Sequence, residues 1–277
     1  MAAVLLRAAS LAFVMVMGIL LKKTGIVEQN AGEVIKKLLI NLTLPATIIV
    51  NFAAIPSIQS SFLFLAFLGM ALDIVGMVVG AWMTKKETPE KKALYMLELP
   101  AYNIGTFCIP FVQSFLPGIG SVSACIFDVG NSVICTGGSY AFVSEYISKS
   151  KNGMDYRQFA KRLLTSPPLM TYVVMFAMSL CKIKIPEQVV TFVSPIANAN
   201  AFIAMMMLGL LFRFEMKKAY IKEIFRLLGM RYILAVLFSI GIYFLLPYDL
   251  VIRQTLVLVC FGPTSAIAPA YTGMCGG

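Results

Sequence analysis

The sequence contains no histidine and few charged residues, and both shortages restrict its function. Histidine is the usual acid–base group near neutral pH and a common zinc ligand, so any proton relay or metal site must do without it. Only 13% of the 277 residues are charged, whereas 59% are hydrophobic, and the mean hydropathy is +0.85. This composition is too apolar for a soluble surface, so it indicates a polytopic membrane protein.

Three further absences limit the possible functions. The phosphate-binding pattern G-x-x-x-x-G-K-[ST] does not occur, so ATP is not the energy source within this chain. The six cysteines lie in or beside apolar runs without paired spacing, which argues against a disulfide framework and a zinc site. Neither Asp73 nor Asp128 follows glycine, the setting expected of paired intramembrane aspartates, and no nucleophile has a histidine as its base. We therefore expect no catalytic residue, no metal and no cofactor.

Nine apolar runs are long enough to cross a bilayer, which needs about 20 residues per helix. They leave almost no chain for a soluble domain, so we expect an all-α polytopic protein surrounded by the lipid bilayer. The first run has no small-residue cleavage site before Lys22, so it reads as a retained helix rather than a signal peptide. The runs cover residues 4–21, 38–54, 62–83, 93–115, 120–147, 160–181, 189–212, 220–246 and 250–274.

The net charge of +10 comes from basic residues that gather in alternate loops. Of the 23 basic residues, 18 lie in the segments 22–37, 85–92, 149–162 and 213–226. The positive-inside rule places these segments in the cytoplasm and the N-terminus outside, for a protein of the cell (plasma) membrane. The charge thus predicts orientation, and it gives no reason to expect a nucleic acid as partner. Arg231 lies inside a run, and we expect its long side chain to snorkel toward the cytoplasmic end.

A repeat relates the two halves of the sequence. A shift of 159 positions places Asn41 on Asn200 and Pro110 on Pro269 without a gap. Five predicted helices separate a residue from its counterpart, so the second copy enters the membrane from the opposite face. We therefore predict an inverted five-plus-five helix repeat.

The repeat also defines the predicted domains. The first five-helix repeat covers residues 1–147, a charged cytoplasmic linker covers 148–156, and the second, inverted repeat covers 157–277. Residue 277 corresponds to Gly118, so the counterpart of the helix at 120–147 is missing. We expect that a tenth helix has been lost from this sequence; the alternative is a protein with nine helices.

Two segments interrupt the apolar runs with proline, glycine and polar residues. They read AYNIGTFCIP at 101–110 and FGPTSAIAPA at 261–270, and the repeat places one on the other. Unpaired backbone groups are costly in hydrocarbon, so such breaks survive only inside protein or beside a wet cavity. The N-termini of half-helices offer free N–H groups and a partial positive charge to an anion. We predict a crossover of two broken helices that binds an anion; the alternative is a pair of proline kinks held by neighbouring helices.

Four short motifs carry a resemblance to a known family. They are NLTLPA at 41–46, YNIGTFCIP at 102–110, FDVGN at 127–131 and GPTSA at 262–266. In order and spacing they resemble the auxin efflux carrier family of permeases, which shares a wider fold group with the bile acid symporters. The resemblance covers essentially the whole chain.

The resemblance implies a ten-helix layout in which helices four and nine cross at a central substrate site. It also implies a scaffold domain built from helices one, two, six and seven, and a moving transport domain built from the others. By motif position, the crossover would be framed by Asn103, Pro110, Pro263 and Pro269. The missing tenth helix is the departure from the family pattern, and it puts a complete transport domain in doubt.

The remaining candidate substrate-binding residues lie in the two breaks or in the predicted scaffold. The hydroxyl groups of Thr106, Thr264 and Ser265 could donate to a carboxylate, and Gly105 is a helix breaker in the first break. Asn41 is a polar scaffold residue that would either line the pathway or join helices.

Four polar residues are candidates for ion coupling or support. A carboxylate at Asp73 is costly in the middle of a span unless it is paired, hydrated or protonated, so it would be either a proton carrier or a hydrogen-bonded structural group. Glu98 precedes the first break and would face either the cavity or the cytoplasmic boundary. Asp128 and Asn131 lie one helical turn apart, so they share a face, either beside the site or in helix–helix hydrogen bonding.

Together these features predict a secondary transporter, a permease that moves a small organic anion by alternating access at the crossover. H+ or Na+ would be the coupling ion, unless membrane potential alone drives transport. The alternatives are a sodium-coupled symporter of the bile acid type and a membrane sensor that binds without transport. Malonate and malate are at least as plausible substrates as auxin, and a homodimer is left open.

Overall fold

The computed structural model describes residues 2–28, 30–54, 60–148, 161, 164–212, 221–265 and 268–275. Its regular elements are helices, and within those residues the extended pairing is limited to an isolated bridge between Tyr102 and Thr264. The prediction of an all-α protein is therefore confirmed. The predicted linker at 148–156 lies outside the described residues apart from Ser148.

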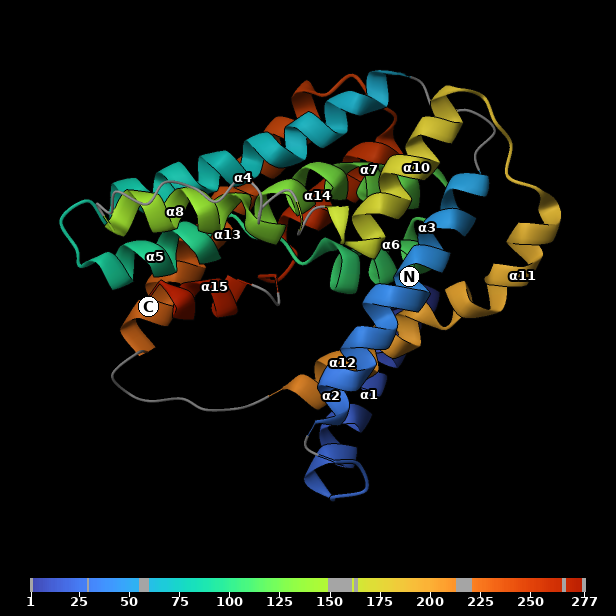
Figure 1. The fold of residues 1–277 in the computed structure, drawn as a ribbon, viewed down its shortest axis with the longest axis horizontal. Coiled ribbons are helices and arrows are strands. Elements are labelled where there is room, and N and C mark those ends of the chain that lie inside the picture. Colours follow the sequence, from blue (N-terminus) through green and yellow to red (C-terminus); the bar gives the residue numbers. More distant parts are fainter. Residues whose placement is uncertain are drawn as a thin grey trace.

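Six α-helices form what we term the first helix group, on the right of Figure 1. In this group α1 packs along α12, α2 also packs on α12, and α3 packs against α10 and α11. The bounds are α1 Ala2–Lys23, α2 Ala31–Leu38, α3 Leu44–Ala53, α10 Pro167–Leu180, α11 Glu187–Asn198 and α12 Asn200–Leu211, with the π-helical turn η1 Leu39–Thr43 between α2 and α3.

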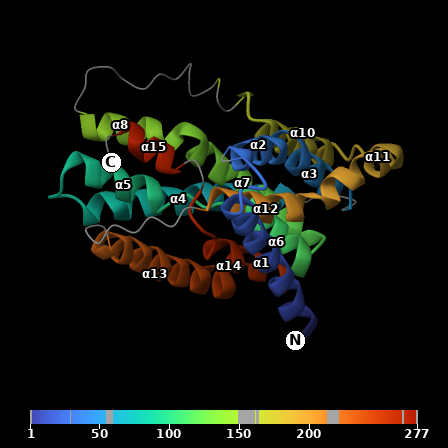
Figure 2. The same cartoon turned by 90° about the horizontal axis from the view of Figure 1, so that it is seen from below.

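The other helices form the second helix group, in which α7 packs against α4, α6 and α14. Figures 1 and 2 show α5, α8, α13 and α15 of this group on the opposite side of the molecule from α11, with α6 and α7 between them. The bounds are α4 Leu63–Met83, α5 Pro89–Glu98, α6 Ile109–Phe115, α7 Ile119–Val133, α8 Ser139–Ser148, α13 Ile221–Leu245, α14 Leu250–Cys260 and α15 Ala268–Met274, with the short turns η2 Ser60–Phe62, η3 Ile104–Cys108 and η4 Ile134–Gly138.

Glycines let helices approach closely within each group. In the second group Gly130 of α7 lies against the Ala66 carbonyl of α4 with no room for a Cβ. In the first group Gly209 of α12 lies in the same way against the Met15 carbonyl of α1. Small residues at such contacts are typical of helix packing inside a membrane, where van der Waals contact replaces the hydrophobic effect.

Three helical segments are long and apolar enough to cross a membrane, judged by length and composition over the described residues. They are α4, α13 and the segment Glu187–Leu211 formed by α11 and α12. The run at 4–21 lies within the continuous helix α1, but several others fold as shorter, interrupted helices; the run at 93–115, for example, becomes α5, η3 and α6. The nine predicted runs therefore do not correspond to nine continuous helices in this structure.

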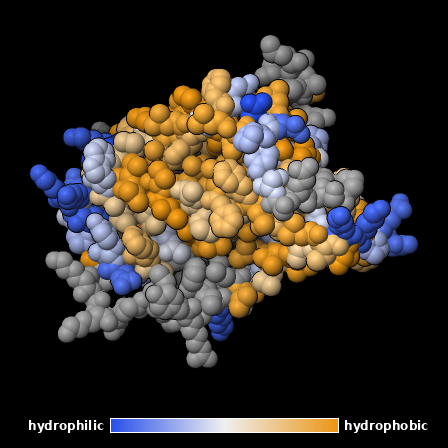
Figure 3. Space-filling view, turned by 90° about the horizontal axis from the view of Figure 1, so that it is seen from above, coloured by the Kyte–Doolittle hydropathy of each residue, from blue (hydrophilic) through white to orange (hydrophobic). Residues whose placement is uncertain are grey.

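The outer surface has the apolar character expected of a protein in lipid. In Figure 3 hydrophobic residues cover the middle of the face shown, and most hydrophilic residues lie toward its two ends. Large apolar side chains such as Phe67, Phe192 and Phe244 are strongly exposed. An apolar patch of this extent is unfavourable in water but suits contact with acyl chains.

Two of the basic segments that the sequence places on one side of the membrane contact each other, and a third contacts the end of α12. Lys22 Nζ donates to the Leu210 carbonyl at 2.8 Å, which joins the end of α1 to the end of α12. Lys91 Nζ lies 3.0 Å from Glu223 Oε1 at the start of α13. This hydrogen bond raises the pKa of Lys91, so the lysine stays charged at neutral pH. These basic residues thus fasten the end of α1 to the end of α12 and the start of α5 to the start of α13.

The order of the helices fits the predicted shift of 159 positions. The bounds of α15, Ala268–Met274, are those of α6, Ile109–Phe115, moved by that number. The long helices α4 and α13 also correspond approximately. The inverted relation between the halves stays a prediction.

Candidate functional site

The two predicted breaks lie side by side. Backbone hydrogen bonds join them, from Asn103 N to the Pro263 carbonyl at 2.9 Å and from Ser265 N to the Ala101 carbonyl at 3.0 Å. These bonds surround the antiparallel bridge between Tyr102 and Thr264. The breaks therefore satisfy part of each other's free backbone, which is what a low-dielectric interior demands.

Proline marks the start of a new helix in each break rather than a kink within one. Pro110 lies in the first turn of α6, directly after the π-helical turn η3. Pro269 likewise lies in the first turn of α15, whereas Pro263 is in the extended pairing. A first-turn proline costs little because its missing N–H has no partner within the helix. Within an α-helix the Pro110 ring would clash with the carbonyl of Thr106, four residues earlier, and the wider π-helical turn η3 avoids this clash.

Asn131 of α7 fastens the first break to the neighbouring helix. Its Oδ1 accepts from the Tyr102 N–H at 3.3 Å, and its Nδ2 donates to the Tyr102 carbonyl at 3.2 Å. The same Nδ2 donates to Asp128 Oδ1 at 2.8 Å. The buried Asn131 amide thus bonds the N–H and the carbonyl of Tyr102, which would bond to other backbone groups in a continuous helix. It also links Tyr102 to the Asp128 carboxylate.

Asp128 is buried and accepts several hydrogen bonds. Besides Asn131, the Ser132 hydroxyl donates to Oδ1 at 3.4 Å, and the Tyr172 hydroxyl of α10 donates to Oδ2 at 2.9 Å. Tyr172 belongs to the first helix group and Asp128 to the second. The carboxylate therefore lies where the two groups meet.

Arg231 holds the ends of both interrupted helices, and the expectation that it snorkels is wrong. It is only 5% exposed, and its guanidinium donates to the carbonyls of Glu98, Leu99, Ala101 and Gly262 at 3.0, 2.7, 3.2 and 3.0 Å. It also lies over the Tyr102 ring, 4.9 Å from the ring centre. The sequence could not reveal this, because the four carbonyls become free only when the two helices break beside α13.

Asp73 and Glu98 lie behind the breaks. Asp73 is fully buried, and neither carboxylate oxygen has a hydrogen-bond partner among the described residues. The charges of Arg231 and Asp128 act on it electrostatically. Glu98 accepts from the Thr272 hydroxyl of α15 at 3.2 Å. Neither residue lines the cavity described next.

A cavity of about 190 Å³ opens beside the first break. The predicted residues that line it are Asn103, Gly105, Thr106, Asp128, Asn131 and Ser265. The first helix group adds Lys36 of α2 and Ser166 before α10, and the second adds Ser132 of α7 and Tyr102. Thr106 donates to Asn103 Oδ1 inside it. The cavity thus contains one amine, one carboxylate, two amides and several hydroxyls.

The sequence matches a known family over nearly its whole length. The family described as membrane transport protein, that of the auxin efflux carriers, matches residues 3–275. The chain belongs to this auxin efflux carrier family. Its members are membrane transporters, so this permease is an integral membrane protein of transport function. A search of curated proteins finds no match.

Besides Asp73 and Glu98, four residues predicted to bind substrate in this auxin efflux carrier family member do not line the cavity. Pro110, Pro263, Thr264 and Pro269 shape or border the breaks, as described above. A fifth, Asn41, is exposed, and its Nδ2 donates to the Lys37 carbonyl at 2.7 Å. Its counterpart in the repeat, Asn200, is instead buried and accepts from Thr43 at 2.9 Å.

Sequence reasoning about this permease missed Lys36, Ser132 and Tyr172. Lys36 was assigned to orientation because it lies in a basic loop. Ser132 follows the FDVGN motif directly and shares its helix face with Asp128, so spacing alone could have found it. No signal marked Tyr172, since an isolated tyrosine in an apolar run reads as packing.

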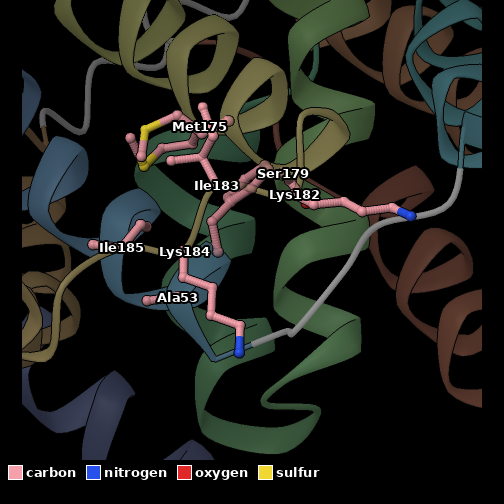
Figure 4. A pocket seen from close by; sticks show the side chains of 9 residues that line it. Ala53, Met175, Ser179, Lys182, Ile183, Lys184 and Ile185 are labelled. Atoms are coloured by element: carbon pink, nitrogen blue, oxygen red, sulfur yellow. The ribbon is translucent and has the colours of Figure 1, made fainter.

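A second cavity, of about 250 Å³, lies between the C-terminal ends of α3 and α10 (Figure 4). Its wall mixes apolar side chains such as Phe52, Met175 and Met178 with the polar Ser179. The side chains of Lys182 and Lys184 extend from its edge in different directions. None of the predicted site residues of this auxin efflux carrier family member lines it.

Proposed function

We propose that this permease is a secondary transporter of a small organic anion, working by alternating access at the crossing of its two interrupted helices. The observation that carries the proposal is the polar cavity beside two breaks that hydrogen-bond to each other. Such a site, lined from two separate groups of helices, can open to either side when one group moves against the other.

The lining chemistry supports an anion of modest size. The Asn103 amide and the hydroxyls of Thr106 and Ser265 can donate to a carboxylate, and Lys36 supplies a positive charge at the same cavity. Gly105 borders the cavity with backbone rather than side chain. A volume of about 190 Å³ suits a short mono- or dicarboxylic acid. Pro110, Pro263, Thr264 and Pro269 serve in this proposal by shaping the breaks, and Asn41 has no role.

Asp128 supports H+ as the coupling ion. An anion in the cavity would lie close to this carboxylate, and two like charges in a low-dielectric site repel strongly. A proton carried on Asp128 removes the repulsion, so anion and proton would bind together. Asn131 orients Asp128 through its hydrogen bond to Oδ1. In this proposal the carboxylates of Asp73 and Glu98 offset the positive charge of Arg231.

The two helix groups supply the parts of an alternating-access device. The first helix group corresponds to the scaffold that the family resemblance implied, and the second holds the breaks and the buried charges. Since no phosphate-binding loop occurs in the sequence, movement would draw on an ion gradient or on membrane potential.

The orientation is proposed from the basic segments, with the N-terminus outside and the protein in the cell membrane. Cys181 is exposed after α10, in a loop proposed to face outward. A membrane-impermeant maleimide applied to intact cells should label the protein at Cys181, and Cys181→Ser should remove the label. Labelling that requires permeabilised cells would reverse the orientation.

The function is tested by reconstitution into proteoliposomes. Counterflow of radiolabelled malonate, malate and indole-3-acetate should reveal at least one substrate, and that acid should raise the thermal midpoint of the purified protein. Asn103→Ala should abolish both effects, whereas Asn41→Ala, which removes an exposed amide, should keep both.

Three outcomes would contradict parts of the proposal. Binding without counterflow would favour the sensor. Loss of uptake when choline replaces sodium would favour a sodium symporter over H+ coupling. Ligand shifts and counterflow that survive Asn103→Ala would show that the cavity is not the site.

A further inference from the structure

One hydrogen bond at the cavity joins the two helix groups. The Tyr172 hydroxyl of α10 donates to Asp128 Oδ2 of α7 at 2.9 Å, and both side chains are buried. Among the described residues, Gln113 Nε2 lies 3.4 Å from Asn51 Oδ1 and Asn51 Nδ2 lies 4.0 Å from Cys125 Sγ, both longer contacts between the groups. The buried Cys125 thiol of α7 is a further hydrogen-bonding partner of Tyr172. The bond to Asp128 is therefore the strongest candidate for a polar link between the groups.

The partners of Asp128 make this link depend on the charge of the carboxylate. Asn131 and Ser132 donate to Oδ1 from the same helix, so they travel with Asp128 in any movement. Tyr172 donates to Oδ2 from the other group and would be left behind. A hydrogen bond to a carboxylate is about twice as strong as one to a neutral acceptor. Neutralising Asp128 thus weakens the link between groups while its contacts within α7 keep it in place.

We propose that Tyr172 is a latch between the helix groups, held by ionised Asp128 and loosened when Asp128 becomes neutral. This inference rests on the proposed function, in which Asp128 gains a proton as the anion enters the cavity. The proton binds a carboxylate oxygen, no other bond forms or breaks, and the groups become free to move. Ligand entry would thereby be coupled to the change in access.

Several titratable groups surround Asp128, and their charges also affect its protonation. Tyr172 lies on α10, Asp73 on α4, and Lys36 of α2 lines the cavity; the buried thiols nearby are Cys125 of α7, Cys108 of η3 and Cys135 of η4. Asp73 is the other acid in this set, so the test changes Asp128 and Tyr172 directly rather than changing pH.

The latch is tested by measuring the distance between the groups without any substrate. Nitroxide labels are attached to cysteines at Val78 of α4 and Val173 of α10, which are 59% and 49% exposed. The parent protein carries Cys181→Ser and Cys275→Ser, because the other four cysteines are buried and unreactive. Double electron–electron resonance then gives the populations of the conformations.

Tyr172→Phe should change the ratio of the conformations by about tenfold, the effect expected from one hydrogen bond to a charged acceptor. Asp128→Asn keeps an acceptor but removes the charge, so it should shift the ratio in the same direction by less. Tyr248→Phe is the matched control, because that hydroxyl donates to the Ser61 carbonyl within the second group at 2.7 Å. It should leave the ratio unchanged.

The latch is refuted if Tyr172→Phe leaves the distances as in the parent, if Tyr248→Phe shifts them equally, or if one conformation persists in all variants. The result is separable from the proposed function. A shift in conformations without counterflow of any organic acid would retain the latch and refute the transported substrate class, whereas counterflow with unchanged distances would do the reverse.

Discussion

The two helix groups differ in what they bury. Among the described residues, the buried polar side chains of the first group are neutral, and Thr43, Thr47 and Asn200 join helices within that group. The second group buries four ionisable residues of formal charge, namely Asp73, Glu98, Asp128 and Arg231. Neutral hydrogen bonds in an apolar interior add cohesion at modest cost, whereas buried charges are costly and persist where function needs them.

This contrast indicates a division of work. The first group is held by close backbone approach at Gly209 and by neutral side chains, which suits a rigid support. The second group carries interrupted helices whose free carbonyls are bound by a single arginine. Changes to equivalent kinds of residue in the two groups should therefore have different consequences.

The largest effect is expected at Arg231. Arg231→Met leaves four buried carbonyls without their donor, and we expect a loss of about 3 kcal/mol or more of unfolding free energy, together with loss of transport. Thermal unfolding in detergent, with size-exclusion profiles, measures this. The control is Arg253→Met, which loses one bond, to the Tyr243 carbonyl at 2.7 Å, in an exposed setting. Equal losses in both variants would show that Arg231 has no special role at the breaks.

Asn131 and Asn200 compare one buried amide from each group. Asn131→Ala and Asn200→Ala should each cost about 1 to 3 kcal/mol of stability, since each leaves a partner unsatisfied. Only Asn131→Ala should also abolish the ligand-induced rise in thermal midpoint, because Asn131 positions the break and Asp128. If Asn200→Ala also abolishes the ligand-induced rise in thermal midpoint, the two helix groups do not differ in their role in binding.

Replacing Asp73 is expected to have the opposite effect on stability from replacing the other buried polar residues. Its unpartnered carboxylate costs stability if ionised, so Asp73→Asn should leave the thermal midpoint unchanged or raise it. Transport driven by a proton gradient should nevertheless fall, because the variant changes the charge balance around Arg231. Parallel measurements of unfolding and of uptake at several pH values distinguish the two effects. A strongly destabilised variant would show that the carboxylate is structural.

The smallest effect is expected at the surface, where water solvates and screens charged side chains. Lys91→Ala removes the contact with Glu223, and the thermal midpoint should fall by only roughly one degree, less at high salt. The bond raises the pKa of Lys91, so its contribution persists at neutral pH and is lost only as pH rises through that raised value. A loss comparable to that of Arg231→Met would contradict the distinction between buried and exposed charge.

The sequence located the breaks but not what surrounds them. Proline, glycine and asparagine at 101–110 and 261–270 predicted the interruptions because these residues remove or compete for helical hydrogen bonds. The pairing of Asn103 with Pro263 was within reach, since the repeat places the two breaks at matching positions. Arg231 was misjudged because its distance along a helix says nothing about which free carbonyls lie beside it.

The chain by itself determined the membrane setting, the helical class, the family and the places where helices stop, because each follows from local composition and spacing. Only the tertiary structure decided which buried groups meet: Tyr172 with Asp128, and Arg231 with four carbonyls from two helices. A polar group buried in an apolar interior costs free energy unless it is hydrogen-bonded. Which group becomes its partner depends on the packing of helices that are distant in sequence.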